Sequence, residues 1–213
     1  MVNLDQYYVV HSENTKNYPM MNGEITPNIR SQCSGKYRDD NGDKILINNR
    51  IEIELAPEDY SYHINLAFPK PNKPEYVDFH MYDLEQSVSN KFVEAFEGFP
   101  GVQFLQGTEG EVINELKLDY YLVHYLQAIK CMDMEKSKVK TSKSGRIISY
   151  EKLVLNYEVL NNIPEDQRLI FWLWERPSTR IVHQKFVDIY NEAGLKGARF
   201  VPIEQYNEET AFM

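Results

Sequence analysis

A pattern that occurs twice is the strongest constraint on how this chain can fold. One copy spans residues 182–202 and the other residues 88–105, and both contain Lys-Phe-Val followed by Gly-x-x-Phe. The copies are offset by 94 residues at the lysines, Lys91 and Lys185, and by 96 at the second glycines, Gly101 and Gly197. Each copy predicts a short amphipathic helix, a glycine stop and then a strand.

In the second copy, Val182, Phe186 and Ile189 are spaced by four and three residues, which predicts that they share one helical face. Gly194 and Gly197 can supply the positive φ angles needed to leave the helix and enter a strand. Two interpretations stay open. The copies arise from a duplication, which the shared Lys-Phe-Val and Gly-x-x-Phe favour, or a common hydrophobic pattern makes them similar.

Short runs rich in apolar and β-prone residues, some alternating with polar residues and some continuously apolar, predict most of the remaining structure as strands. Residues 6–10, 45–47, 51–55, 62–68, 77–81, 120–126, 147–155 and 169–174 have this character. Residues 120–126 are apolar on both faces, as in a central strand, and residues 156–162 predict one helical turn. The fold class expected is α+β, or mixed α/β, with mainly antiparallel sheets, a few short helices and two related halves that each end in a helix–Gly–strand unit.

The 213 residues allow one domain or two small ones. The pattern breaks around Gly107–Gly110, which predicts an N-terminal half over residues 1–110 and a C-terminal half over residues 111–213. One continuous domain is the alternative.

The formal net charge of −9 makes nucleic acid an unfavourable partner and favours a basic protein. Lys136, Lys138, Lys140 and Lys143 form the one run that approaches a basic patch, and a solvated loop is the preferred interpretation of it over an anion site. Cys33 and Cys131 have no C-x-x-C spacing, so we expect free thiols in a reducing compartment. With no basic leader and no apolar run of 18 residues, a cytoplasmic protein without a membrane segment is expected.

The sequence shows no recognisable catalytic, metal-binding or cofactor-binding motif. None of the five histidines has the i, i+4 spacing of a zinc helix, and G-x-S-x-G, P-loop and G-x-G-x-x-G patterns are absent. The acidic run of residues 39–43 lacks the ligand spacing of a calcium loop, and Cys131 beside Lys130 lacks a positioned base. His183 and its counterpart Ser89 differ, so no shared chemistry is expected there. An enzyme with an unrecognised cleft would have to use His124 or Cys131.

Residues 120–200 resemble a known family. The resemblance is carried by Tyr-Tyr-Leu-x-His, by residues 129–137 with their Asp-x-x-x-Ser run, by residues 169–171, and by the closing Gly-Leu-x-Gly-x-x-Phe of residues 194–200. It extends to Asp78-Phe79-His80. These motifs are similar to those of the bacterial polymorphic-toxin immunity family numbered eleven. Lys130 departs from the Asp that many relatives have at this position.

The resemblance implies a cytoplasmic inhibitor, used in bacterial competition, that is encoded beside a delivered toxin and neutralises that toxin by direct binding. A basic cognate toxin is the expected partner, with no cofactor, no nucleic acid and no membrane involved. Acidic loops are the expected contact sites, and the candidate partner-binding residues are Asp39, Asp40, Asp43, Glu204, Glu208 and Glu209. A scaffold protein that assembles through its sheet edges is the further alternative.

Overall fold

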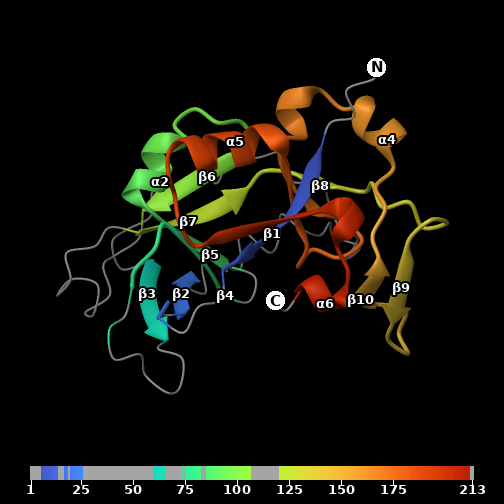
Figure 1. The fold of residues 1–213 in the computed structure, drawn as a ribbon, viewed down its shortest axis with the longest axis horizontal. Coiled ribbons are helices and arrows are strands. Elements are labelled where there is room, and N and C mark those ends of the chain that lie inside the picture. Colours follow the sequence, from blue (N-terminus) through green and yellow to red (C-terminus); the bar gives the residue numbers. More distant parts are fainter. Residues whose placement is uncertain are drawn as a thin grey trace.

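The chain forms an α+β fold of mainly antiparallel sheets and short helices, as the sequence predicts (Figure 1). A computed structural model describes residues 6–13, 17–18, 20–25, 60–65, 73, 75–82, 85–106 and 120–211. The expected hairpin of residues 45–55 lies outside these residues.

The larger sheet has five strands in the order β13-β1-β12-β11-β8. They are β1 (Tyr7–Ser12), β8 (Ala128–Ile129), β11 (Ile170–Leu173), β12 (Arg180–His183) and β13 (Ala198–Pro202). All neighbours in it are antiparallel except β11 and β8.

The second sheet has four antiparallel strands in the order β4-β5-β7-β6. They are β4 (Phe79–Tyr82), β5 (Glu85–Ser89), β6 (Val102–Gln106) and β7 (Tyr120–Tyr125). Two-stranded ribbons are formed by β2 (Met20–Ile25) with β3 (Tyr60–Asn65), and by β9 (Lys138–Thr141) with β10 (Ile147–Lys152). The helices are α2 (Asn90–Ala95), α4 (Tyr157–Asn161), α5 (Gln184–Glu192) and α6 (Glu208–Ala211), with short 3-10 turns η2 (Glu165–Gln167) and η3 (Ile203–Gln205).

The five-stranded sheet is buried on both faces. Along β11, Phe171 and Leu173 belong to one core cluster, whereas Ile170 belongs to the other and Trp172 packs against it. Successive side chains of a strand point to opposite faces, so a strand covered on both sides must be apolar at every position. This explains the nearly continuous apolar run that predicts β11.

The two copies of the sequence pattern form units with the same topology. In each unit a strand leads into a helix and then into a second strand, giving β5-α2-β6 and β12-α5-β13. The two strands flank a central antiparallel strand, which is β7 in the first sheet and β1 in the second. The central strand β7 confirms the expectation for residues 120–126.

The register is the same in both units. Val88 lies opposite Tyr121 where Val182 lies opposite Tyr8, and the pairs Phe104 with Val123 and Phe200 with Val10 also correspond. A short series of hydrogen bonds recurs as well. Tyr121 donates to Asn90 and Asn90 to Glu94 in the first unit, and Tyr8 donates to Gln184 and Gln184 to Asp188 in the second. Duplication remains a prediction, which this correspondence supports.

Both helices begin later than the sequence pattern indicates. Val182 was expected on the helical face, but it lies in β12, fully buried, and α5 begins at Gln184. The buried residues of α5 are Phe186, Val187 and Tyr190. The helix starts where His183 can cap it: its Nδ1 accepts a hydrogen bond from the backbone N–H of Lys185. The sequence does not separate strand from helix because Val182, Phe186 and Ile189 keep helical spacing across the junction.

In both copies, a side chain at this position caps the N-terminus of the helix. Ser89 Oγ accepts a hydrogen bond from the N–H of Phe92 at 3.2 Å, in the way that His183 accepts one from Lys185 at 3.1 Å. The sequence comparison set aside a common role because the residues differ. Their common role is structural, since each satisfies a donor that the first helical turn leaves free.

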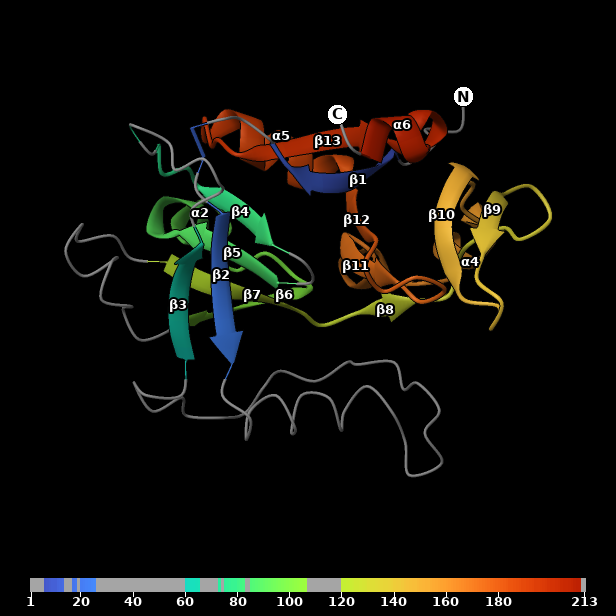
Figure 2. The same ribbon diagram turned by 90° about the horizontal axis from the view of Figure 1, so that it is seen from below.

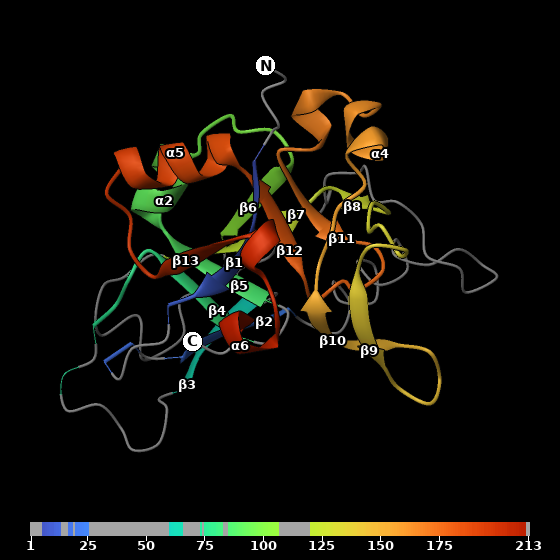
Figure 3. The same ribbon diagram turned by 45° about the vertical axis from the view of Figure 1, so that its right-hand side comes forward.

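Rings from the two helices form the centre of the molecule. Phe92 and Phe96 of the first unit contact Phe186 and Tyr190 of the second, and the Phe96 and Phe186 ring centroids are 4.4 Å apart. The helices α2 and α5 accordingly lie side by side in Figures 1 and 3. Aromatic burial of this kind is the largest apolar contribution that single side chains can make.

Two glycines allow each repeated unit to approach closely the part of the fold that contains the other unit. A Cβ on Gly101 would come within 2.9 Å of Ile170 Cγ2, and a Cβ on Gly197 would overlap Phe79 O and the Val77 side chain. Both glycines have positive φ, +87° and +102°. Backbone hydrogen bonds from Phe79 N to Lys196 O and from Leu126 N to Gly101 O lie beside these contacts.

Each sheet draws strands from both sides of the predicted boundary. In the five-stranded sheet, β1 pairs with β12 and β13, and in the four-stranded sheet, β7 pairs with β5 and β6. Residues 107–119, which contain the expected boundary at Gly107–Gly110, lie outside the described residues. The division into residues 1–110 and 111–213 stays a prediction.

Replacing Gly197 by Ala should strongly destabilise the fold, because the new methyl group would overlap the backbone of β4 and the residue would keep a positive φ. We expect a loss of about 3 kcal/mol or more in the free energy of unfolding. Gly98→Ala is the matched control: its φ is +72°, nothing lies within 4 Å, and only the backbone strain of about 1 kcal/mol remains. Urea denaturation measures both, and equal losses would contradict the close-contact explanation.

Candidate functional site

The ribbon formed by β9 and β10 stands out from the body of the protein (Figures 1, 2 and 3). We call residues 138–152, which comprise β9, β10 and their connecting turn, the basic ribbon. Its five Lys and Arg side chains, Lys138, Lys140, Lys143, Arg146 and Lys152, are all exposed, and Glu151 is its one carboxylate. The expectation of a solvated loop is correct for the charged side chains, which are exposed, and wrong for the backbone, which forms a pair of strands. The cross-strand pair Val139 and Tyr150 packs one face of these strands against the core.

The ribbon is anchored at its base by backbone hydrogen bonds. Met132 and Leu155 form an isolated bridge, and Asn156 N donates to Cys131 O at 2.7 Å. Asp133 N donates to Val154 O at 2.9 Å. The segments that enter and leave the ribbon are therefore held together before β9 begins, which limits how far the ribbon can swing.

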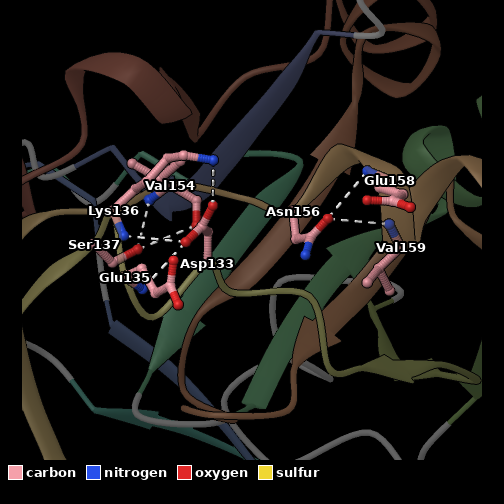
Figure 4. A network of polar contacts seen from close by, with 8 residues as sticks. All are labelled: Asp133, Glu135, Lys136, Ser137, Val154, Asn156, Glu158 and Val159. Carbon is pink, nitrogen blue, oxygen red and sulfur yellow. Dashed lines mark hydrogen bonds and ion pairs between the residues drawn. The ribbon is translucent and has the colours of Figure 1, made fainter.

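The hydroxyl of Ser137 completes this base (Figure 4). It donates to Val154 O at 3.2 Å and accepts from Val154 N at 2.9 Å, so one side chain satisfies both backbone groups of that residue. Half-buried backbone groups left without such partners would cost free energy comparable to a lost hydrogen bond. Ser137 thus does for Val154 what a neighbouring strand would do.

Asp133 shapes the turn that leads to Ser137. Its carboxylate accepts from the backbone N–H groups of Glu135 and Lys136 at 3.1 and 3.0 Å, and Lys136 Nζ lies 2.8 Å from Oδ2 (Figure 4). The hydrogen bond from the Lys136 side chain is the main cause that lowers the pKa of Asp133. Where the chain leaves the ribbon, Asn156 caps α4 by accepting hydrogen bonds from the N–H groups of Glu158 and Val159.

The inner face of the ribbon rests on tyrosines and arginines. The Tyr150 hydroxyl lies 3.0 Å from Thr179 Oγ1, and the Arg176 guanidinium lies over the Tyr150 ring at 5.1 Å. The ring of Tyr206 is 5.7 Å from that of Tyr150. The ring of His11 stacks on Tyr206 with centroids 5.5 Å apart.

His11 lies in a positively charged environment. Burial, followed by the charges of Arg199, Arg180 and Arg176, lowers the pKa of its imidazole from 6.5 to about 4. Arg199 is the cross-strand neighbour of His11 in β13. The imidazole is therefore neutral at physiological pH, and its protonation opposes the folded state.

The two residues that the enzyme hypothesis requires are buried. His124 lies in β7 with 6% of its surface exposed, and Cys131 lies in the core with 1% exposed. Burial, with Glu175 as a further cause, raises the pKa of the Cys131 thiol well above its usual value, so the reactive thiolate is disfavoured. Cys33 lies outside the described residues.

The structure describes only some of the predicted partner-binding residues. Asp39, Asp40 and Asp43 lie outside the described residues. Glu204 is exposed in η3 and Glu209 is exposed in α6, with Glu208 at the start of that helix. The structure brings the last three into one segment near the C-terminus, and their role in binding stays a prediction.

Two further features concern cations and membranes. Within the described ranges, no group of three or more His, Cys, Asp or Glu side chains could hold a metal ion. No helix in that part of the chain is long and apolar enough to cross a bilayer.

The fold and the ribbon define an α+β protein that presents a firmly anchored, charged strand pair at its surface. The chain belongs to the Immunity protein family (Imm11), whose family model matches residues 24–205. No curated protein matches it. Membership implies a role in immunity to a toxin, and it confirms the family that the motifs of residues 120–200 resemble.

The motifs that carried the resemblance are structural in this fold. Asp133 and Ser137, the ends of the Asp-x-x-x-Ser run, build the base of the ribbon. Asp78 joins the two repeated units, because its carboxylate accepts from Ser89 Oγ at 2.7 Å and from Lys196 N at 3.0 Å. The sequence did not single out the basic ribbon as a site, although its Lys-x-Lys alternation is the signal that could have done so.

Replacing Ser137 by Ala should loosen the base of the ribbon by removing both hydrogen bonds to Val154. We expect a loss of about 1 to 3 kcal/mol in the free energy of unfolding and faster amide exchange of Val154. Ser144→Ala in the exposed turn, where the hydroxyl bonds only to Ser142, should change stability by less than about 0.5 kcal/mol. Chemical denaturation and hydrogen exchange check both variants. Unchanged exchange at Val154 would rule out this role of Ser137.

Stability should fall on acidification through the protonation of His11. The pKa of His11 is about 4 in the folded protein and 6.5 in the unfolded chain. The contribution of the neutral imidazole to the free energy of unfolding is therefore complete above pH 6.5 and is lost as the pH falls toward 4. The effect is on the order of 2 to 3 kcal/mol. Comparison of wild type with His11→Asn by urea denaturation between pH 7 and pH 4 isolates it. If both proteins lose the same stability across this window, His11 does not contribute.

Proposed function

We propose that this chain is an immunity protein that neutralises a cognate toxin by binding it directly in the cytoplasm of the producing cell. Membership of the Imm11 family over residues 24–205 is the observation that carries the proposal. The raised thiol pKa of Cys131 and the burial of His124 support inhibition by contact rather than by catalysis.

The charge of the chain supports a basic toxin as the partner. A formal net charge of −9 attracts a positively charged protein over distances comparable to the Debye length, about 8 Å at physiological ionic strength. Such attraction chiefly accelerates association. Within this proposal, Glu204, Glu208 and Glu209, together with Asp39, Asp40 and Asp43, contribute to steering.

The decisive experiment expresses the chain together with the product of each adjacent gene. One of those products should be toxic when expressed alone, should lose its toxicity when this chain is present, and should co-purify with it. If no neighbouring product is both toxic and bound by the purified chain, the proposal fails.

The steering contribution has its own test. Association of the purified toxin with wild type should slow by about tenfold or more between 20 and 500 mM salt, whereas dissociation should change little. Glu204→Lys combined with Glu209→Lys should reduce the association rate, and Glu204→Gln with Glu209→Gln should do so less. Stopped-flow fluorescence or surface plasmon resonance measures these rates. A rate that does not depend on salt would exclude electrostatic steering by a basic partner.

A further inference from the structure

The basic ribbon has the opposite charge from the rest of the chain. With five basic side chains and one acidic one it carries a formal charge of +4, within a chain whose formal charge is −9. All five basic side chains are exposed. An acidic patch on a partner that is basic overall would be repelled by most of the molecule and attracted to this segment, so the ribbon can fix the orientation of such a partner.

Two strand registers place the positive charges on one face. Lys140 lies opposite Ser149, and Lys138 lies opposite Lys152. Residues that face each other in a ladder share a face of the sheet, and the neighbouring pair of Val139 with Tyr150 points the other way, into the core. The outer face of the ribbon therefore presents lysines, while the inner face holds it to the body.

The direct opposition of Lys138 and Lys152 is unfavourable in the free protein. Like charges that face each other across two strands destabilise the ladder. A carboxylate placed between two such ammonium groups would relieve this repulsion and form charge-assisted hydrogen bonds with both. The arrangement costs stability when empty and favours an anionic group when occupied.

Apolar side chains adjoin the same charges. Of the large hydrophobic residues in the described ranges, Met134 and Ile148 are the exposed ones, at 58% and 54%. Ile148 is the extra residue of a bulge in β10, between the pairs formed by Ile147 and Ser149, and Met134 lies in the turn at the base of the ribbon. An apolar contact with a rim of charged groups is the usual composition of a protein interface.

We propose that the basic ribbon is the recognition element for an acidic, concave patch on a protein partner that is basic overall, with Ile148 as its apolar contact and Lys138, Lys140 and Lys152 as carboxylate ligands. This rests on the proposed function in taking the partner to be the cognate toxin. Its rigid base, held by Ser137 and Asp133, means that the ribbon is ordered before it binds, so little conformational entropy is lost on association.

The test compares charge reversals at matched positions. Lys138→Glu with Lys140→Glu should weaken binding of the purified toxin at least tenfold, and Lys138→Arg with Lys140→Arg should bind within about twofold of wild type. Lys73→Glu with Lys196→Glu changes the net charge by the same amount at exposed sites outside the ribbon and should have less than a threefold effect. Ile148→Ser should weaken binding by about fivefold or more. Circular dichroism and thermal unfolding confirm that each variant is folded.

Isothermal titration calorimetry separates the outcomes. If wild type binds the toxin and the variant Lys138→Glu with Lys140→Glu binds it equally well, the ribbon proposal is wrong and the proposed function stands.

If wild type binds no neighbouring toxin, the proposed function fails, and NMR with a ten-residue oligoglutamate peptide then decides the ribbon proposal. Its chemical-shift changes should be confined to residues 134–152, and changes located elsewhere would overturn the proposal. Tighter binding to phosphatidylglycerol vesicles or to a 20-base-pair DNA duplex than to any protein probe would also overturn it.

Discussion

Close contact between the two larger sheets, each of which contains one repeated unit, is the constraint on which the rest of the structure depends. Gly197 lets β13 approach β4, Gly101 lets β6 approach β11, and rings of α2 and α5 fill the space between the units. Neither unit could bury its aromatic residues alone, because Phe96 and Phe186 have each other as their nearest rings. The arrangement gives the two units one shared core cluster, although the sheets that line it have separate hydrogen-bond ladders.

The core cluster that contains Phe171 and Leu173 supports the surface on which recognition is proposed. Tyr150, Leu153 and Leu155 pack beneath the ribbon, and Tyr206 closes the same cluster from the C-terminal side. Because these side chains belong to the core that covers the five-stranded sheet, the ribbon is joined to the most buried part of the molecule. A surface of this kind keeps its shape when it is approached by a partner.

The sequence predicted the fold class, the central strand β7, the strand β11, the helical turn α4 and the helix–Gly–strand order of both copies. It misplaced the helix starts because Val88 and Val182 each lie four residues before a helical Phe, which is helical spacing. Periodicity cannot locate a cap made by Ser89 or His183. The second strand of the ribbon, β10, was predicted within residues 147–155, but β9 was mistaken for a loop because four lysines within residues 136–143 dominate its composition. The base of the ribbon depends on Ser137 and Val154, which are 17 residues apart in the sequence, so local patterns cannot show their pairing.

The position of β1 has a consequence for how the protein is made. This strand comes from residues 7–12, yet both of its neighbours, β12 and β13, are synthesised after residue 179. During translation its two edges therefore wait for partners until residues 180–202 have left the ribosome, and such non-local pairing is slow. A chain that stopped before residue 179 would keep the strands of the four-stranded sheet but would lack the five-stranded sheet, which supplies part of the core cluster beneath the basic ribbon.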